Sequence, residues 1–456
     1  MVGHVLVFPY PAQGHMLPLL DLTHQLASRG LTITILVTPK NLPFLTPLLS
    51  SHPSLISPLV LPFPPHPSIP PGVENTLDLP ASSFRHMMCA LSSLRDPLLR
   101  WLRSHPSPPS SLIFDMFLGW SHHLASSLSL PSFAFFPSGA FAISFLHSLW
   151  RLMPHADPVS FPDIPCSPTY PWWQLSPVFR SYVKGDPDSE FIKDSYLANF
   201  LGHGLIFNSF HEIEGAHLDY LAQKKFNVWA VGPLLPPGHV TDRGGSSSVI
   251  AAEVCSWLDT CQDDSVVYVC FGSQAVLTNE QMTELASGLE KSGVRFVLSV
   301  KGATVGHGDG AYGSVPEGFE ARVAGRGLVI RGWSPQVEIL RHGAVRAFLT
   351  HCGWNSTLES VVAGVPMLAW PMGADQYLNA TLLVEQLGVA IRVCEGPTTV
   401  LGSDELVRVL GEVAGDGWSE KRARAVALSK AAGEAMKDGG KSYKNLDDFA
   451  GLLAQK

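Results

Sequence analysis

The chain has 456 residues, more than one hydrophobic core usually supports, so two domains are expected. Hydrophobic residues make up 46% and charged residues 15%, which is enough for packed cores and argues against disorder. The formal net charge is -8 and there is no Lys/Arg cluster, which excludes a typical nucleic-acid-binding protein.

The seven cysteines are scattered and form no C-x-x-C pair. This argues against a disulfide framework or a zinc site and fits a reducing compartment, so we expect a cytoplasmic protein. The N-terminal segment Val5–Pro9 indicates a strand rather than a signal peptide. Residues 116–150 carry no charge, but two prolines and a glycine interrupt them. We therefore expect a buried helix–strand–helix there and no stable membrane insertion.

In chain order, short apolar strands alternate with helical spacing through the first half. The expected strands are His4–Phe8, Ile33–Thr38, Leu112–Phe114, Ser132–Phe136 and Leu205–Phe207. A helix is expected over Leu17–Ser28, and the Pro-rich segments Pro62–Pro71 and Pro154–Pro177 are expected to be loops over a pocket. Such alternation is typical of a parallel sheet covered on both faces.

The alternation breaks after Gly232, and the polar Asp242–Ser248 stretch is the best candidate for a linker. It then resumes. The expected strands are Val266–Cys270, Arg295–Val300, Leu328–Arg331, Val345–Leu349 and Pro366–Ala369, and the expected helices are Gln281–Glu290, Thr357–Val362, Gln376–Gln386 and most of Asp404–Leu453. The pattern predicts the α/β class, with two Rossmann-like domains facing each other across an inter-domain cleft.

Two literal motifs lack their structural context. Gly308–Gly313 matches G-x-G-x-x-G, but no strand leads directly into it and Pro316 follows it, so a loop is favoured. A nicotinamide oxidoreductase depends on this loop alone. Asp186 and Asp188 form a D-x-D, but nothing nearby completes an oxygen cage, so we expect no metal site.

The strongest local signal is Ala347–Glu359, in which an apolar strand leads through a turn containing Gly353 to a helix expected to begin near Ser356. Free N–H groups at the helix start, with His351 as a further donor, suit a diphosphate. Ser356 and Glu359 equally fit a capping box of the form S-x-x-E. The residues alone support both interpretations.

A second candidate pair consists of His15, after the first strand, and Asp115, after Leu112–Phe114. Both positions fall at carboxyl ends of strands expected to be parallel, where open α/β sheets bind ligands. A carboxylate behind a histidine fixes the tautomer and makes a general base. A single His and a single Asp often match by accident, so the residues alone do not establish the pair.

The stretch from Trp333 to Gln376 resembles the signature box of plant secondary-product UDP-glycosyltransferases, which act on flavonoids and other phenolics. Phe271–Ser273 and Gly14–Pro18 match two further segments of that family, and the resemblance covers essentially the whole chain. It implies the GT-B fold. An acceptor-binding domain would span residues 1–240 and a UDP-sugar-binding domain 249–440, with a final helix, 441–456, packing back on the first domain.

The resemblance implies that Trp333, Gln336 and Glu359 hold the uridine. It places the diphosphate at the start of the helix expected near Ser356, and the sugar beside Asp375 and Gln376 at the end of the signature box. The implied donor-site residues are Ser273, Trp333, Gln336, His351, Gly353, Trp354, Asn355, Ser356, Glu359, Asp375 and Gln376. His15, backed by Asp115, would deprotonate the acceptor hydroxyl, which displaces UDP with inversion and needs neither metal nor cofactor.

Candidate acceptor-pocket residues are the aromatic and apolar side chains Phe84, Met87, Phe117, Phe141, Trp172 and Trp173, each of which could equally be ordinary core. By the same resemblance, Gln376 implies a glucose donor, whereas Pro137 stands where many relatives carry Ser or Thr, so rhamnose and xylose donors are kept as alternatives. A non-catalytic UDP-sugar sensor on the same fold is a further alternative. We expect a monomer whose partners are the UDP-sugar and a small phenolic acceptor.

Overall fold

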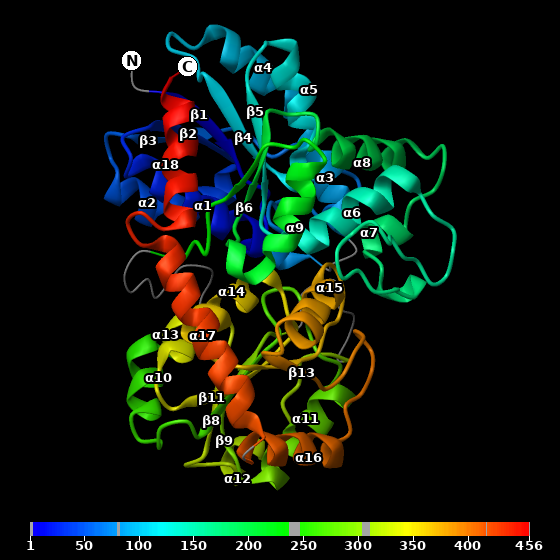
Figure 1. The fold of residues 1–456 in the computed structure, drawn as a ribbon, viewed down its shortest axis with the longest axis vertical. Helices are drawn as coiled ribbons and strands as arrows, with labels where there is room; N and C mark the ends of the chain where they lie inside the picture. The colour runs from blue at the N-terminus through cyan, green and yellow to red at the C-terminus, as the bar shows by residue number, and fades with distance from the viewer. Residues whose placement is uncertain (1–2, 80–82, 237–246, 303–310, 416, 456) are drawn as a thin grey trace. The chain divides into compact units, whose positions relative to one another are not determined.

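The computed structural model describes residues 3–79, 83–236, 247–302, 311–415 and 417–455. The chain forms two compact units, one made of Met1–Pro236 with Glu434–Lys456 and the other of Pro237–Gly433. Each unit contains one parallel β-sheet packed among helices (Figure 1). This confirms the expected α/β class.

The first unit has a seven-stranded sheet in the order β3-β2-β1-β4-β5-β6-β7, in which every pair is parallel. Its strands are β1 (His4–Phe8), β2 (Thr32–Val37), β3 (Ile56–Val60), β4 (Ser111–Asp115), β5 (Ser132–Phe136), β6 (Gly204–Phe207) and β7 (Val228–Ala230). The central strands β4, β5 and β6 are buried at every position because helices cover both of their faces.

Around this sheet lie helices formed from the intervening segments. They are α1 (Gln13–Ala27), α2 (Thr46–Ser51), α3 (Phe84–Ser92), α4 (Arg95–Ser104), α5 (Trp120–Ser127), α6 (Ala140–Leu152), α7 (Pro177–Arg180), α8 (Pro187–Ala198) and α9 (His211–Gln223), with short 3-10 turns η1 (Pro39–Leu45), η2 (Thr76–Asp78), η4 (Met116–Leu118) and η5 (Trp172–Gln174). The uncharged stretch 116–150 forms η4, α5, β5 and α6, as expected. Within the described part of the chain, no helix is both long enough and apolar enough to span a bilayer.

Helix α18 (Lys441–Ala454) completes the core of the first unit, although it comes from the other end of the sequence. Figure 1 shows it in red beside the blue N-terminal elements. Phe449 and Leu453 are fully buried, and the Phe449 ring meets Phe133 edge-on with 5.1 Å between centroids. The Asn445 side chain donates a 2.9 Å hydrogen bond to the carbonyl of the last residue of β7. The helix therefore fills one face of the sheet with apolar side chains.

The second unit has a six-stranded parallel sheet in the order β10-β9-β8-β11-β12-β13. Its strands are β8 (Val266–Cys270), β9 (Arg295–Val300), β10 (Gly327–Arg331), β11 (Val345–Thr350), β12 (Met367–Ala369) and β13 (Ala390–Arg392). Its helices are α10 (Ala251–Leu258), α11 (Asn279–Ser292), α12 (Phe319–Arg322), α13 (Gln336–Arg341), α14 (Trp354–Ala363), α15 (Gln376–Thr381) with the π-helical turn η6 (Leu382–Gln386), α16 (Ser403–Ala414) and α17 (Trp418–Met436). The division between the units falls inside α17, between Gly433 and Glu434.

Several local predictions need correction or fall outside the described residues. Strands β3, β7 and β13 were not anticipated, because β3 contains Pro58 and the other two have only three residues each. Proline is tolerated in β3 because that strand lies at the sheet edge, where one row of N–H groups is unpaired. Most of the expected linker and the first part of the Gly308–Gly313 motif lie outside the described residues.

Candidate active site

His15 and Asp115 meet at the carboxyl edge of the first sheet. Strand β1 has β2 on one side and β4 on the other, so the carboxyl ends of β1 and β4 flank the point where strand order reverses, the usual ligand site of such sheets. His15 lies in the first turn of α1, and Asp115 is the last residue of β4. The structure thus brings together two residues that are 100 positions apart.

The geometry of this pair fixes the tautomer of the histidine. His15 Nδ1 lies 2.9 Å from Asp115 Oδ2 and 3.1 Å from Oδ1. The Asp115 side chain is fully buried, while His15 is 17% exposed. An ionised carboxylate can only accept hydrogen bonds, so Nδ1 carries a hydrogen, and in the neutral imidazole Nε2 is the nitrogen without one. Such a histidine can accept a proton from a ligand at Nε2.

Aromatic side chains enclose the pair. The Phe117 ring lies against His15 with 4.4 Å between centroids, and its backbone N–H donates a 2.9 Å hydrogen bond to Asp115. Tyr10 packs edge-on against Phe117 at 5.0 Å, and its hydroxyl donates to the carbonyl of Phe84. Burial, with a smaller contribution from the charge of Asp115, raises the pKa of Tyr10 well above its ordinary value. Tyr10 therefore stays protonated and apolar surfaces frame the histidine.

The expected acceptor residues divide into three groups. Phe84 and Phe117 pack against one another near His15, with 5.9 Å between their centroids. Phe141 stacks on the buried His217 ring at 4.5 Å, and Met87 is fully buried on α3, so both are part of the packed interior. Trp172 and Trp173 lie in η5, where Trp173 is exposed and Trp172 contacts Phe179.

In the second unit, β8 takes the place of β1, with β9 and β11 as its neighbours. The turn after β8 and the turn after β11 therefore lie side by side at the carboxyl edge. A Cβ atom on Gly272 would lie 2.6 Å from the His351 ring, and one on Gly353 would lie 2.5 Å from it. Both glycines are required because the imidazole fills the space between them. Burial lowers the pKa of His351 to about 4, so the ring is neutral and can donate one hydrogen bond.

Helix α14 begins at Trp354, two residues before the expected start. Its N-cap is Gly353, which has no side chain to cap the helix, so Ser356 lies inside the first turn. The capping-box interpretation of Ser356 and Glu359 is therefore wrong. The N–H groups of the first turn of a helix have no intrahelical partner, which makes this end suited to an anion.

Three of the expected uridine-site and diphosphate-site residues form one hydrogen-bonded group. Gln336 Nε2 donates to Ser356 Oγ at 2.9 Å and to Glu359 Oε2 at 2.6 Å. At the other end of the amide, Gln336 Oε1 accepts from Tyr268 at 3.2 Å, and the Tyr268 hydroxyl lies 2.6 Å from Ser334 Oγ. Sequence analysis missed Tyr268 and Ser334, because nothing in an apolar strand marks one tyrosine as a polar contact.

At the end of the signature box, near Asp375 and Gln376, side chains hold the turn by hydrogen bonds to the backbone. Gln376 Oε1 accepts from the N–H groups of Met372 at 2.9 Å and Gly373 at 3.0 Å. Asn379 donates both to Asp375 at 3.1 Å and to the carbonyl of Cys352 at 2.9 Å. Asn379, also missed by sequence analysis, thus links the two turns that carry the expected sugar-site and diphosphate-site residues.

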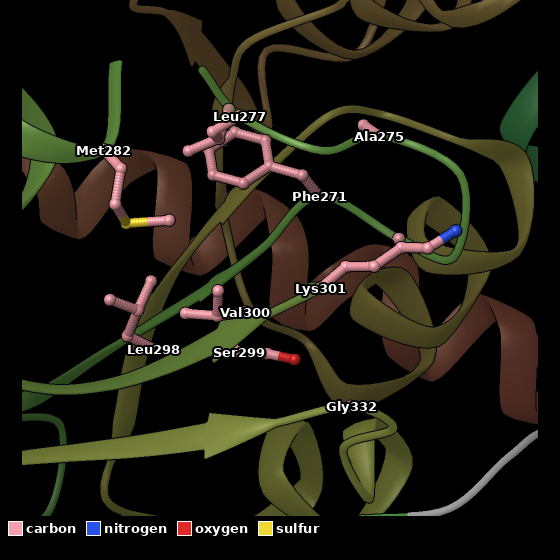
Figure 2. Close-up of a pocket in the computed structure, with 10 residues that line it drawn as sticks. Phe271, Ala275, Leu277, Met282, Leu298, Ser299, Val300, Lys301 and Gly332 are labelled. Atoms are coloured by element: carbon pink, nitrogen blue, oxygen red, sulfur yellow. The ribbon is translucent and has the colours of Figure 1, made fainter. Parts of the chain in front are cut away.

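A small hollow lies at the carboxyl ends of β8, β9 and β10. It is lined by apolar side chains of β9, of the segment that follows β8 and of α11, and by Gly272, Ser299, Lys301 and Gly332. Figure 2 shows the Lys301 side chain extending toward the turn after β8, where its ammonium donates to the carbonyl of Ser273. A cation therefore stands beside one of the expected diphosphate residues, although sequence analysis did not single it out.

The D-x-D motif has a structural role in the first unit. Asp186 caps α8 by accepting from the N–H of Ser189 at 3.0 Å, and it pairs with Arg85 of α3 at 2.9 Å. Asp188 lies in the first turn of α8, where a carboxylate is favourable. In the part of the chain that the structure describes, no three His, Cys, Asp or Glu side chains are grouped to hold a metal ion.

Comparison with known proteins identifies the family. Residues 243–428 match the family model described as UDP-glucoronosyl and UDP-glucosyl transferase. The chain is 58% identical to UDP-glycosyltransferase 89B2 of Stevia rebaudiana, over 99% of this chain and 98% of that one. It is 53% identical to the flavonol 3-O-glucosyltransferase UGT89B1 of Arabidopsis thaliana, over 98% and 95% of the two chains.

Comparison with solved structures indicates the same family. The structure of Arabidopsis thaliana UGT89C1 complexed with UDP-L-rhamnose is 41% identical, covers both chains completely and has a TM-score of 0.83. UGT89C1 has also been solved complexed with quercetin, at 40% identity and a TM-score of 0.82. The chain belongs to the plant secondary-product UDP-glycosyltransferase family and is a UDP-glycosyltransferase. This rules out the oxidoreductase alternative and leaves the non-catalytic sensor without support.

Proposed function

We propose that the protein transfers a sugar from a UDP-sugar to a hydroxyl of a flavonol-like phenol, with inversion at the anomeric carbon. The observation that carries the proposal is the His15–Asp115 pair at the carboxyl edge of the first sheet. A histidine with an unprotonated Nε2, framed by Phe117 and Tyr10, suits an aromatic acceptor that must lose a proton. The named activity of UGT89B1 and the quercetin complex of UGT89C1 support this class of acceptor.

In the proposed reaction His15 Nε2 takes the proton of the phenol as its oxygen attacks the anomeric carbon. The new carbon–oxygen bond forms while the bond from that carbon to the UDP oxygen breaks, and UDP leaves with the electron pair. Asp115 stabilises the imidazolium that results. A phenol has a pKa near ~10, so it is mostly protonated at neutral pH and gains much from this base.

The second unit would hold the donor in this scheme. The start of α14 and the neutral His351 would donate hydrogen bonds to the diphosphate, and Lys301 would add positive charge beside Ser273. Trp333 would stack on uracil, and Gln336 with Glu359 would meet the nucleoside. These donors suit a departing diphosphate without a metal ion, so we expect transfer to persist in the presence of EDTA.

For the sugar, we propose glucose first. Gln376 and the 53% identity to a protein named as a glucosyltransferase support it. Rhamnose is the second choice, supported by Pro137, which offers no donor to a 6-hydroxyl, and by the likeness to UGT89C1 bound to UDP-L-rhamnose. Xylose, which has no 6-hydroxyl, is the third.

One chain supplies all the residues of the scheme, so we propose a monomer. We place it in the cytoplasm because all seven cysteines are free thiols, which fits a reducing compartment. Size-exclusion chromatography with light scattering tests the first point, and localisation of a fluorescent fusion tests the second.

A mass-spectrometric transfer assay tests the proposal. Purified protein is incubated with UDP-glucose, UDP-rhamnose or UDP-xylose and a panel of flavonols and simple phenols, alongside the His15→Ala variant. We expect a single hexose adduct with UDP-glucose that the variant does not form. A clear preference for UDP-rhamnose would overturn the choice of sugar, and full activity of the variant would overturn the role of His15.

A further inference from the structure

We propose that Tyr268 is a positioning residue for the nucleoside end of the donor site, acting through Gln336 and Ser334. The proposal rests on the proposed function, because it assumes that the second unit binds a uridine nucleotide. Tyr268 does not reach the ligand in this account. Its hydroxyl holds the segment that carries Trp333 and the amide that orients Glu359.

Tyr268 lies in the middle of β8 and is fully buried. Its ring stacks on Phe348 of the neighbouring strand β11, with 4.8 Å between centroids and 17° between planes. The hydroxyl engages polar groups: both Ser334 Oγ and Gln336 Oε1 lie within hydrogen-bond distance of it, at 2.6 Å and 3.2 Å, and the Cys270 side chain is a further partner. A single oxygen thus ties the Trp333–Gln336 segment to the sheet at two points.

The direction of each hydrogen bond follows from the chemistry of the groups. The carboxylate of Glu359 can only accept, so the amide nitrogen of Gln336 must face it and the amide oxygen must face Tyr268. That oxygen can only accept, so the tyrosine donates its one hydrogen there, and the Ser334 hydroxyl must donate to Tyr268. Burial raises the pKa of Tyr268 well above its ordinary value, which keeps this hydrogen in place at any working pH.

The chain of bonds leads from the core of the sheet to the expected ligand groups. It runs from Ser334 to Tyr268, from Tyr268 to Gln336, and from Gln336 to Ser356 and Glu359. The amide is held at both ends, and its nitrogen in turn holds one carboxylate oxygen of Glu359. Preorganised groups lose less conformational entropy when a ligand binds, so this arrangement favours nucleotide affinity.

A purely structural tyrosine would behave differently from a positioning one. Phenylalanine keeps the ring and its stack on Phe348, so the Tyr268→Phe variant removes only the hydroxyl. If the hydroxyl merely stabilises the sheet, the variant loses stability but binds nucleotide as well as the wild type. If it positions the uridine site, the variant binds every uridine-containing ligand less tightly by a similar factor.

The test compares UDP with uridine. Titration calorimetry gives the Kd for UDP, and ligand-observed NMR gives the Kd for uridine, for the wild type and Tyr268→Phe. We expect both constants to rise by about 2- to 10-fold, the effect of one neutral hydrogen bond. The KM for the phenolic acceptor should stay unchanged. Tyr170→Phe is the matched control, because Tyr170 is a buried tyrosine of the first unit and its change should leave both constants unaltered.

Ser334→Ala provides a second, independent variant that leaves the tyrosine ring in place, in case Tyr268→Phe folds poorly. It should raise the Kd for uridine and the Kd for UDP by the same factor. The double variant should raise each Kd by less than the product of the two single effects. Unchanged affinity in both single variants, or weaker UDP binding with unchanged uridine binding, would overturn the positioning role. Failure of the wild type to bind UDP would instead refute the proposed function on which it rests.

Discussion

Replacing Asp115 by Asn should remove the base function of His15 while leaving its ring in place. Asp115 Oδ1 accepts the Phe117 N–H at 2.9 Å and lies 3.1 Å from His15 Nδ1, whereas Oδ2 is the nearer oxygen to His15 Nδ1, at 2.9 Å. An asparagine must keep its carbonyl oxygen toward the Phe117 N–H, because an amide NH2 group cannot accept that bond. Its NH2 group then faces His15 Nδ1, which becomes an acceptor, and the imidazole proton moves to Nε2.

With the proton on Nε2 the ring cannot take one from the acceptor. General-base catalysis contributes about 10²- to 10⁴-fold, so kcat with a weakly acidic phenol should fall by that factor. The Kd for UDP should not change, because the expected donor residues belong to the second unit. Circular dichroism and the melting temperature should confirm that Asp115→Asn is folded.

The discriminating assay uses two acceptors of similar size. A flavonol hydroxyl is protonated at neutral pH and needs the base, whereas a nitrophenol that is already ionised at the assay pH does not. We expect Asp115→Asn to show the large fall in kcat with the flavonol and a far smaller fall with the ionised nitrophenol. Asp194→Asn is the control, because Asp194 also pairs with a histidine, at 2.8 Å, but both side chains are exposed. Equal losses for both acceptors, or no loss for either, would refute the tautomer argument.

Three further predictions follow from burial. Gly353→Ala would place a Cβ 2.5 Å from the His351 ring, so we expect the ring to be displaced. The free energy of unfolding in urea should fall by about 1–3 kcal/mol and UDP should bind less tightly. An unchanged Kd for UDP would contradict this prediction. Glu214→Ala removes the buried carboxylate that accepts the first two N–H groups of α6, at 2.7 and 3.1 Å, and should cost about 1–3 kcal/mol by the same measurement, more than Glu214→Gln. Burial lowers the pKa of His351 and of His147 to about 4, below the unfolded value of 6.5. The unfolded state therefore binds more protons between pH 6.5 and 4, and the free energy of unfolding should decline as pH falls through that range. His147→Phe should make the melting temperature less dependent on pH in the same range.

The class of fold was predictable because strand and helix patterns repeat along the chain. Parallel strands present their carboxyl ends at one edge, so the meeting of His15 with Asp115 could be anticipated although 100 positions separate them. Such an inference uses the direction of the strands and needs no side-chain detail.

Other features depended on details that sequence does not carry. Phe141 and Phe117 are both aromatic and follow neighbouring strands, but α6 turns Phe141 onto His217, while η4 turns Phe117 onto His15. The rotation of a helix about its axis is set by packing, so composition alone could not separate them. The start of α14 lay two residues earlier than expected, which was enough to change the interpretation of Ser356 from a cap to a residue inside the helix.

The place of α18 has a consequence for synthesis on the ribosome. The strands of the first unit are complete once β7 has emerged, but Leu446, Phe449 and Leu453 belong to the same apolar cluster. More than two hundred residues separate β7 from these side chains, a distance that takes on the order of 10–40 s to translate at about 5–20 residues per second. Throughout that interval the part of the apolar cluster that α18 covers is exposed on the nascent first unit, whose complete core can form only after the second unit has been made.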